Sequence, residues 1–254
     1  MVKLKHLCNI YFAQNSKKII LFMFITSIYT GYKIMGAKLS NSSVLEFMLE
    51  MLSDFHLIIF VILPIFGFCV FSALSSRKTM EIIRYKSFYE YFFIGLIPSI
   101  ILAFLFIVII SGFSLIFSLT LKFSTIIQPT DYFDNTIIGV ILSDSSNTIL
   151  NTLLYTSLYL FIGLIFIAIT VSFLFYIIPK KILLLIVALE YILSVLAVQW
   201  GYDEIFPYIF LNNYTILHNA IHNNCAFIQT TIIFITIAFV AIATKKDGGV
   251  PIYD

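Results

Sequence analysis

FFIGLIPSIILAFLFIVIISGFSLIFS, residues 92–118, contains no Asp, Glu, Lys or Arg. The hydrocarbon core of a bilayer is about 30 Å thick, and a helix of about 20 apolar residues crosses it. This stretch is therefore long enough to span a membrane with some tilt. The whole chain agrees, because 61% of its 254 residues are hydrophobic and only 11% are charged, whereas soluble domains have about 25% charged residues.

Five further apolar runs have a similar character and lie at residues 19–36, 56–75, 151–178, 182–199 and 227–243. The sequence therefore predicts an all-α integral membrane protein with six transmembrane helices within residues 19–243. The fourth and fifth runs are separated only by Pro179, Lys180 and Lys181. Proline does not continue a helix interior and paired lysines do not sit in lipid, so we expect a tight helical hairpin here.

The distribution of basic residues predicts the orientation. If the amino terminus is inside, only Lys33, Lys38 and Lys122 lie outside, and the other twelve of the fifteen Lys and Arg residues lie inside. Basic residues gather on the cytoplasmic side of membrane proteins. Both termini are therefore predicted to be cytoplasmic, with residues 244–254 as a cytoplasmic tail.

Two segments outside the predicted spans have a helical pattern. In residues 1–18, Leu4, Leu7 and Tyr11 share one helical face, which predicts an amphipathic helix on the inner membrane surface, in contact with lipid. The alternative is a simple positively charged flank. Residues 200–226 are too polar to span but carry apolar patches around Pro207. They predict a re-entrant or surface-lying helical pair, with an ordinary external loop as the alternative.

The chain lacks the common catalytic and nucleotide-binding motifs. It has no GxxxxGK[ST], HExxH, GxSxG or CxxC, so we expect no enzymatic activity, no cofactor in this chain and no nucleic-acid partner. Glu190, near the middle of the fifth run, is the intramembrane polar candidate. It serves either transport or coupling, or it holds neighbouring helices together by a hydrogen bond. His218, His222 and Cys225 are weak metal candidates, because a complete site needs a fourth ligand.

Residues 77–91, RKTMEIIRYKSFYEY, form a charged segment between the second and third runs. On a helix, its charges pair at three- and four-residue spacing, and apolar side chains stand beside them. Such a helix suits docking onto a soluble partner, with binding to lipid phosphates as the alternative. The candidate docking residues are Arg77, Lys78, Met80, Glu81, Ile83, Arg84, Tyr85 and Lys86.

This arrangement resembles the type-2 ABC transporter permease, and the IIRYKSFYEYF run at residues 82–92 is similar to small bacterial permeases of peptide or bacteriocin export and immunity. The resemblance implies a homodimer or heterodimer of permeases in the bacterial cytoplasmic membrane. Each would be served by a separate ATP-binding cassette ATPase that binds ATP and Mg²⁺, with residues 77–91 as the coupling helix. The implied cargo is a peptide or a lipid-like molecule.

Two other functions fit the same sequence. A stand-alone immunity protein or an ion-coupled transporter would use Glu190 and need no ATPase. A sensor or assembly component would recognise an extracellular ligand through residues 200–226. A neighbouring gene that encodes an ATPase would favour the exporter.

Overall fold

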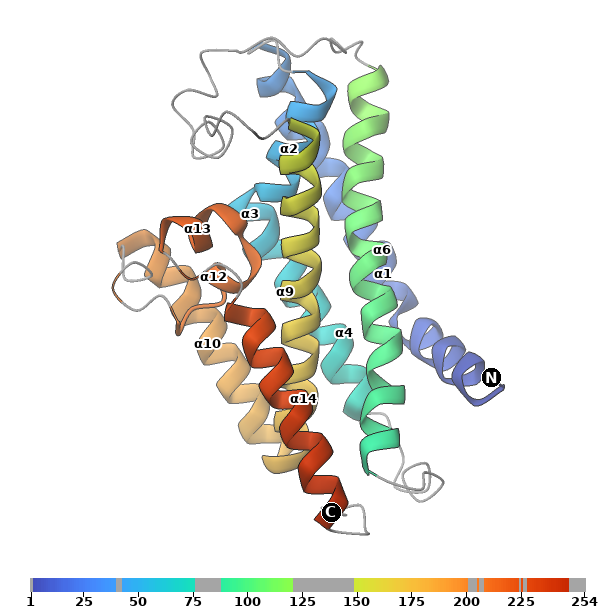
Figure 1. The fold of residues 1–254 in the computed structure, drawn as a ribbon. Coiled ribbons are helices and arrows are strands. Elements are labelled where there is room, and N and C mark those ends of the chain that lie inside the picture. The colour runs from blue at the N-terminus through green and yellow to red at the C-terminus, as the bar shows by residue number, and fades with distance from the viewer. Residues whose placement is uncertain are drawn as a thin grey trace.

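A computed structural model describes residues 2–39, 43–75, 88–120, 149–200, 205, 208–223, 225 and 228–246. These residues are almost entirely helical (Figure 1). The helices are α1 (Val2–Leu39), α2 (Val44–Ser53), α3 (Phe55–Leu57), the π-helical turn η1 (Ile58–Ile62), α4 (Leu63–Ser75), α6 (Phe88–Thr120), α9 (Ile149–Ile177), α10 (Lys180–Trp200), α12 (Asn212–Thr215), α13 (Leu217–His222) and α14 (Ile228–Lys246).

Four stretches in the described residues are long and apolar enough to cross a membrane: Cys8–Ala37, Phe55–Ser75, Gly95–Thr120 and Ile149–Phe175. They match the first four predicted runs, so the chain is a multi-pass membrane protein. The predicted fifth and sixth spans coincide with α10 and with the apolar stretch Ile228–Ala238 of α14. The count of six spans stays a prediction.

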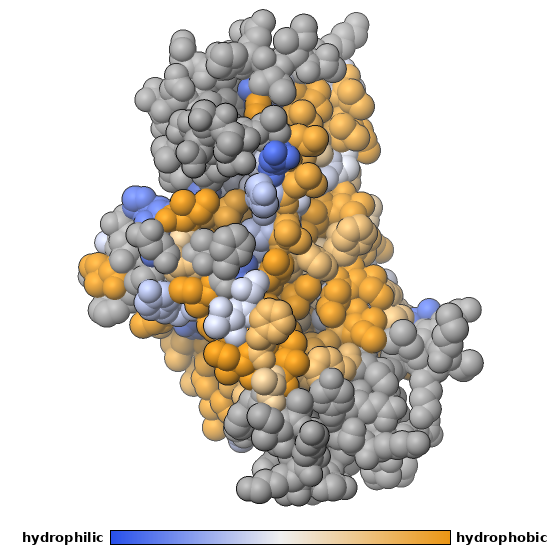
Figure 2. Space-filling model, in the orientation of Figure 1, coloured by the Kyte–Doolittle hydropathy of each residue, from blue (hydrophilic) through white to orange (hydrophobic). Residues whose placement is uncertain are grey.

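The outer surface of the bundle is apolar. Phe104 on α6, Leu185 on α10 and Phe234 on α14 each expose more than half of their surface. Figure 2 shows apolar side chains along α6 and over the lower part of the molecule, where α10 and α14 lie. A soluble protein rarely exposes this much contiguous apolar surface, and lipid is the solvent that suits it.

Three aromatic rings of the core pack together where α1, α4 and α6 meet. The rings of Phe22 and Phe106 stack with centroids 3.9 Å apart, and Phe66 meets Phe106 edge-on at 5.9 Å. All three side chains are fully buried. Offset and edge-on ring pairs add to the energy of area burial, so these rings fix how the three helices face one another.

The predicted hairpin at Pro179 is confirmed. α9 ends at Ile177, α10 begins at Lys180, and the two helices run in opposite directions (Figure 1). The carbonyl oxygen of Pro179 accepts hydrogen bonds from the backbone N–H groups of Ile182 and Leu183. Pro179 lies just before the first turn of α10, where a backbone N–H would have no partner within the helix, so the N–H that proline lacks costs no hydrogen bond.

The amino-terminal segment differs from the predicted arrangement of a surface helix followed by a span. α1 is one continuous helix of 38 residues from Val2 to Leu39, with no break at Lys17 or Lys18. Its placement on a membrane surface stays a prediction.

The predicted coupling residues Arg77 to Lys86 lie outside the described residues, between the end of α4 and the start of α6.

Candidate functional site

Residues 208–223, called here the docked segment, pack against the bundle through two short helices, α12 and α13, which both contact α9 (Figure 1). Asn212, Asn213 and Thr215 are almost completely buried. Polar residues buried this fully need hydrogen-bond partners. The structure has two short helices in this part of residues 200–226, and their position as a re-entrant or surface-lying pair stays a prediction.

Ser194 on α10 anchors one side of the docked segment. Its hydroxyl accepts a hydrogen bond from the backbone N–H of Leu211 at 3.1 Å, and its carbonyl oxygen accepts one from Nδ2 of Asn212 at 3.0 Å. The same hydroxyl donates to Oε1 of Glu190 at 3.3 Å. Glu190, the predicted intramembrane candidate, is therefore linked through one hydroxyl to the point where the segment docks.

Tyr159 on α9 anchors the other side. Its hydroxyl donates to the carbonyl oxygen of Asn213 at 2.6 Å, and its own carbonyl oxygen accepts from Nε2 of Gln229 on α14 at 3.4 Å. The ring of Tyr214 stacks on Phe166 of α9 at 4.8 Å. The docked segment thus joins α9 to α10, while Tyr159 also joins α9 directly to α14.

Three polar atoms around the docked segment are buried and have no hydrogen-bond partner within the described part of the chain: Oδ1 of Asn212, Nδ1 of His218 and Oε1 of Gln229. A buried unpaired group of this kind costs about 1–3 kcal/mol. Two of the three are amide oxygens, which accept hydrogen bonds or coordinate hard cations. Together with Glu190, they are the groups here that a bound molecule or ion could use.

The weak metal candidates do not form a metal centre in the described residues. No group of three or more His, Cys, Asp or Glu side chains is placed there to share an ion. Cys225 is buried in a small cluster with Tyr159, Leu217 and Ala220, whereas His222 is exposed on α13.

His218 makes the stability of the protein depend on pH. Burial, and then the neighbouring His222, lower the pKa of His218 to about 4 from an ordinary value of 6.5. Between these pH values the unfolded chain binds a proton that the folded chain does not, so stability falls as the pH falls from about 6.5 to 4. The full loss is about 3 kcal/mol.

We therefore expect the unfolding temperature in detergent to drop between pH 7.5 and pH 5, and to drop less in His218→Gln. His56→Gln is the matched control, because His56 is 69% exposed. An equal drop in His218→Gln and the unmodified protein would contradict the assignment.

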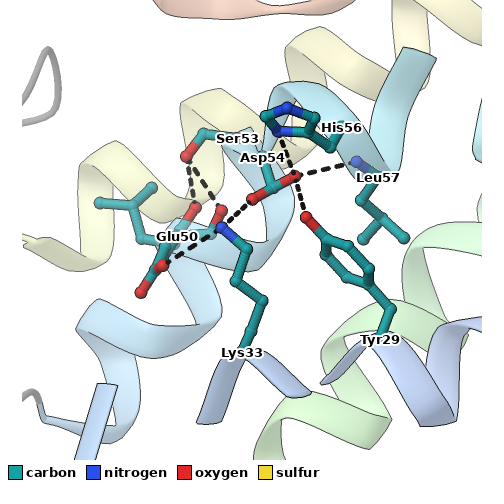
Figure 3. A network of polar contacts seen from close by, with 8 residues as sticks. Tyr29, Lys33, Glu50, Ser53, Asp54, His56 and Leu57 are labelled. Atoms are coloured by element: carbon teal, nitrogen blue, oxygen red, sulfur yellow. Dashed lines mark hydrogen bonds and ion pairs between the residues drawn. The ribbon is translucent and has the colours of Figure 1, made fainter. Parts of the chain in front are cut away.

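A second polar cluster joins α1 to the α2–α3 junction (Figure 3). Nζ of Lys33 lies 2.6 Å from Oδ2 of Asp54 and 3.8 Å from Oε1 of Glu50. Oδ1 of Asp54 accepts from the hydroxyl of Tyr29 at 2.7 Å and from the backbone N–H of Leu57 at 2.9 Å. Only 5% of the Asp54 side chain is exposed.

The charges in this cluster are partly shielded from water. About a quarter of the Lys33 side chain and a fifth of the Glu50 side chain are exposed. Burial raises the pKa of Glu50, and the Lys33 charge partly offsets this effect. From the sequence, Lys33 is predicted only to be one of the three basic residues outside. In the sequence, only the four-residue spacing of Glu50 and Asp54 indicates that both side chains could contact the same residue.

Polar contacts at the opposite end of the bundle join α1 to α4 and α6. Nζ of Lys18 donates to Oγ of Ser72 at 2.6 Å and to Oδ1 of Asn15 at 2.8 Å. The hydroxyls of Tyr11 and Ser99 lie 3.3 Å apart. The ammonium group of Lys18 therefore contacts α4, three residues before that helix ends.

Comparison with protein families, with curated proteins and with solved structures finds no match to this chain.

Proposed function

We propose that this chain is the membrane-spanning permease subunit of an ATP-driven exporter of the ABC class in the bacterial cytoplasmic membrane. It would move a peptide or a lipid-like molecule. In this proposal α10 and α14 are the fifth and sixth spans, and both termini are cytoplasmic. α10 has 21 residues, which gives a length of about 30 Å and matches the hydrocarbon core.

One observation carries the proposal. The charged segment at residues 77–91 follows α4, and its last four residues are the start of α6. Both of these helices are tied to α1 by polar contacts at the same end, Lys18 to Ser72 and Tyr11 to Ser99. A displacement of the segment would therefore reach three membrane helices together. The chain has no phosphate-binding loop, and in this proposal a partner ATPase that binds ATP and Mg²⁺ supplies the energy for such a movement.

The arrangement of the chain gives further support. Each long helix from α1 to α10 runs opposite to the one before, and α14 returns towards the end where α10 begins (Figure 1). The short helical pair before the last helix is the feature expected of the type-2 permeases that the sequence resembles. A second permease copy or a related chain would complete the passage between the two subunits.

Met80, Ile83 and Arg84 are replaced together by Asp. We expect the amount of ATPase that co-purifies, and the resistance to the cargo that the transporter confers, each to fall at least tenfold. The substitution removes the apolar groups that would enter a groove of the ATPase and reverses one charge beside them. The measurement is the amount of ATPase recovered with a tagged permease, together with growth in the presence of the cargo peptide.

Lys181→Asp is the matched control, because it reverses an exposed charge at the start of α10, another position predicted to be inside. Both the ATPase and the resistance should survive in that variant. If they also survive in the triple variant, residues 77–91 do not couple the two subunits. Resistance that needs no ATPase but is lost in Glu190→Gln would instead favour the ion-coupled transporter or immunity protein.

A further inference from the structure

α2 is buried over most of its surface. Its buried positions are Val44, Glu46, Phe47, Leu49, Met51, Leu52 and Ser53. Successive residues turn by about 100° around a helix, so these seven positions cover all of its surface except the side where Glu50 lies. α2 contacts both α6 and α9 and lies beside the upper end of α9 in Figure 1. A short helix in this position closes this end of the bundle.

The carboxyl end of α2 has the features of a hinge. Asp54 ends α2 and caps the start of α3, and its backbone is extended, with φ −66° and ψ 114°. The π-helical turn η1, Ile58–Ile62, follows after only three residues. Such turns loosen the regular helical ladder and are frequent at functional sites. A change of the backbone angles at Asp54 would therefore reorient α2 without bending the membrane helix that follows.

Polar groups hold α2 to α1 at this hinge. Tyr29 and Lys33, one helical turn apart on α1, both bind the Asp54 carboxylate, and Glu50 of α2 lies within 3.8 Å of the same ammonium group. Lys33 and Glu50 are partly exposed, so water can replace these contacts when they separate. The Asp54 side chain is only 5% exposed, so this pair holds more strongly than a surface ion pair does.

We propose that α2 is a movable plug at this end of the bundle, and that the ion pair between Lys33 and Asp54, with Tyr29 and Glu50, is the latch that keeps it closed. The plug and the latch do not depend on which energy source or cargo the protein uses. When the Lys33–Asp54 pair separates, α2 turns about Asp54 and the side chains that face α6 and α9 become accessible to water.

The test uses a cysteine at Leu49, which is 1% exposed on α2, in a chain whose own cysteines, Cys8, Cys69 and Cys225, are replaced by serine or alanine. The purified protein in detergent micelles is treated with a polar maleimide, and the labelling rate is measured. We expect Lys33→Met to raise this rate at least tenfold. Lys33→Arg, which keeps the charge, should restore slow labelling.

A second reporter separates movement of the plug from general loosening. Leu160→Cys lies on α9 and is fully buried, and its labelling should not change in Lys33→Met. If Lys33→Met does not fold, Tyr29→Phe takes its place, because it removes only one hydrogen bond to Asp54 and should raise the rate at Leu49→Cys two- to fivefold. Unchanged labelling at Leu49→Cys, or an equal rise at both reporters, would overturn the proposal.

Discussion

Replacing Gly163 by alanine is expected to lower the stability of the folded protein by roughly 1–3 kcal/mol, the usual cost of overpacking. Gly163 is buried on α9, directly beneath the docked segment. A Cβ atom there would overlap the carbonyl oxygen of Tyr214 and lie 3.1 Å from Cα of Thr215. Both are backbone atoms, which no rotamer change can move away. The segment has to shift, and its hydrogen bonds to Ser194 and Tyr159 lengthen with it.

The measurement is the unfolding temperature in detergent, which should fall by roughly 5 °C. Gly112→Ala on α6 is the matched control, because nothing lies within 4 Å of its added Cβ atom. Alanine favours a helix over glycine by about 0.5–1 kcal/mol, so this control should be neutral or slightly stabilising. If the two variants shift the unfolding temperature equally, the docked segment does not pack on α9 as described.

Replacing Asp54 by alanine is expected to destabilise the protein by roughly 2–4 kcal/mol. Removing one partner of a buried ion pair costs about 3–5 kcal/mol, and the partial exposure of Lys33 reduces this figure. The substitution also removes the acceptor for Tyr29 and the cap on the backbone N–H of Leu57. Lys33 is then left beside Glu50 at 3.8 Å.

Two variants resolve the contributions to this effect when their unfolding temperatures are compared with that of Asp54→Ala. Asp54→Asn keeps the helix cap and loses the charge, so its unfolding temperature should lie between those of Asp54→Ala and the unmodified chain. His56→Ala should change little, because the His56 ring is largely exposed and lies 4.0 Å from Asp54. An effect of Asp54→Ala as small as that of His56→Ala would show that the cluster adds nothing to stability.

Several elements of the fold are predictable from the sequence because their causes are local. The apolar run at residues 92–118 has no charge to place in lipid, and its backbone groups must be satisfied within the segment, so it has to be a helix. Pro179 and the two lysines after it end one helix and begin another for equally local reasons. The polarity of residues 200–226, interrupted by apolar patches, predicts the short helices α12 and α13.

The candidate sites are less predictable. Glu190 stands out in the sequence as a carboxyl in an apolar run. The sequence around its hydroxyl partner, Ser194, does not indicate that Ser194 contacts Leu211 and Asn212. Lys33 and Asp54 are separated by 21 positions in the chain and look like ordinary charges of an outer loop. The coupling role of residues 77–91 stays a prediction.

The sequence by itself therefore determined that the chain lies in a membrane, where its apolar helices run and where the hairpin turns. Only the tertiary structure decided which helices are neighbours, that α2 contacts α1, α6 and α9, and that Asp54 faces Tyr29 and Lys33. The physical reason is that a membrane helix is apolar on all of its faces, because both the lipid and the protein interior that it contacts are apolar. Its hydrophobic pattern therefore does not reveal which face packs inward, and contacts between distant residues depend on that face.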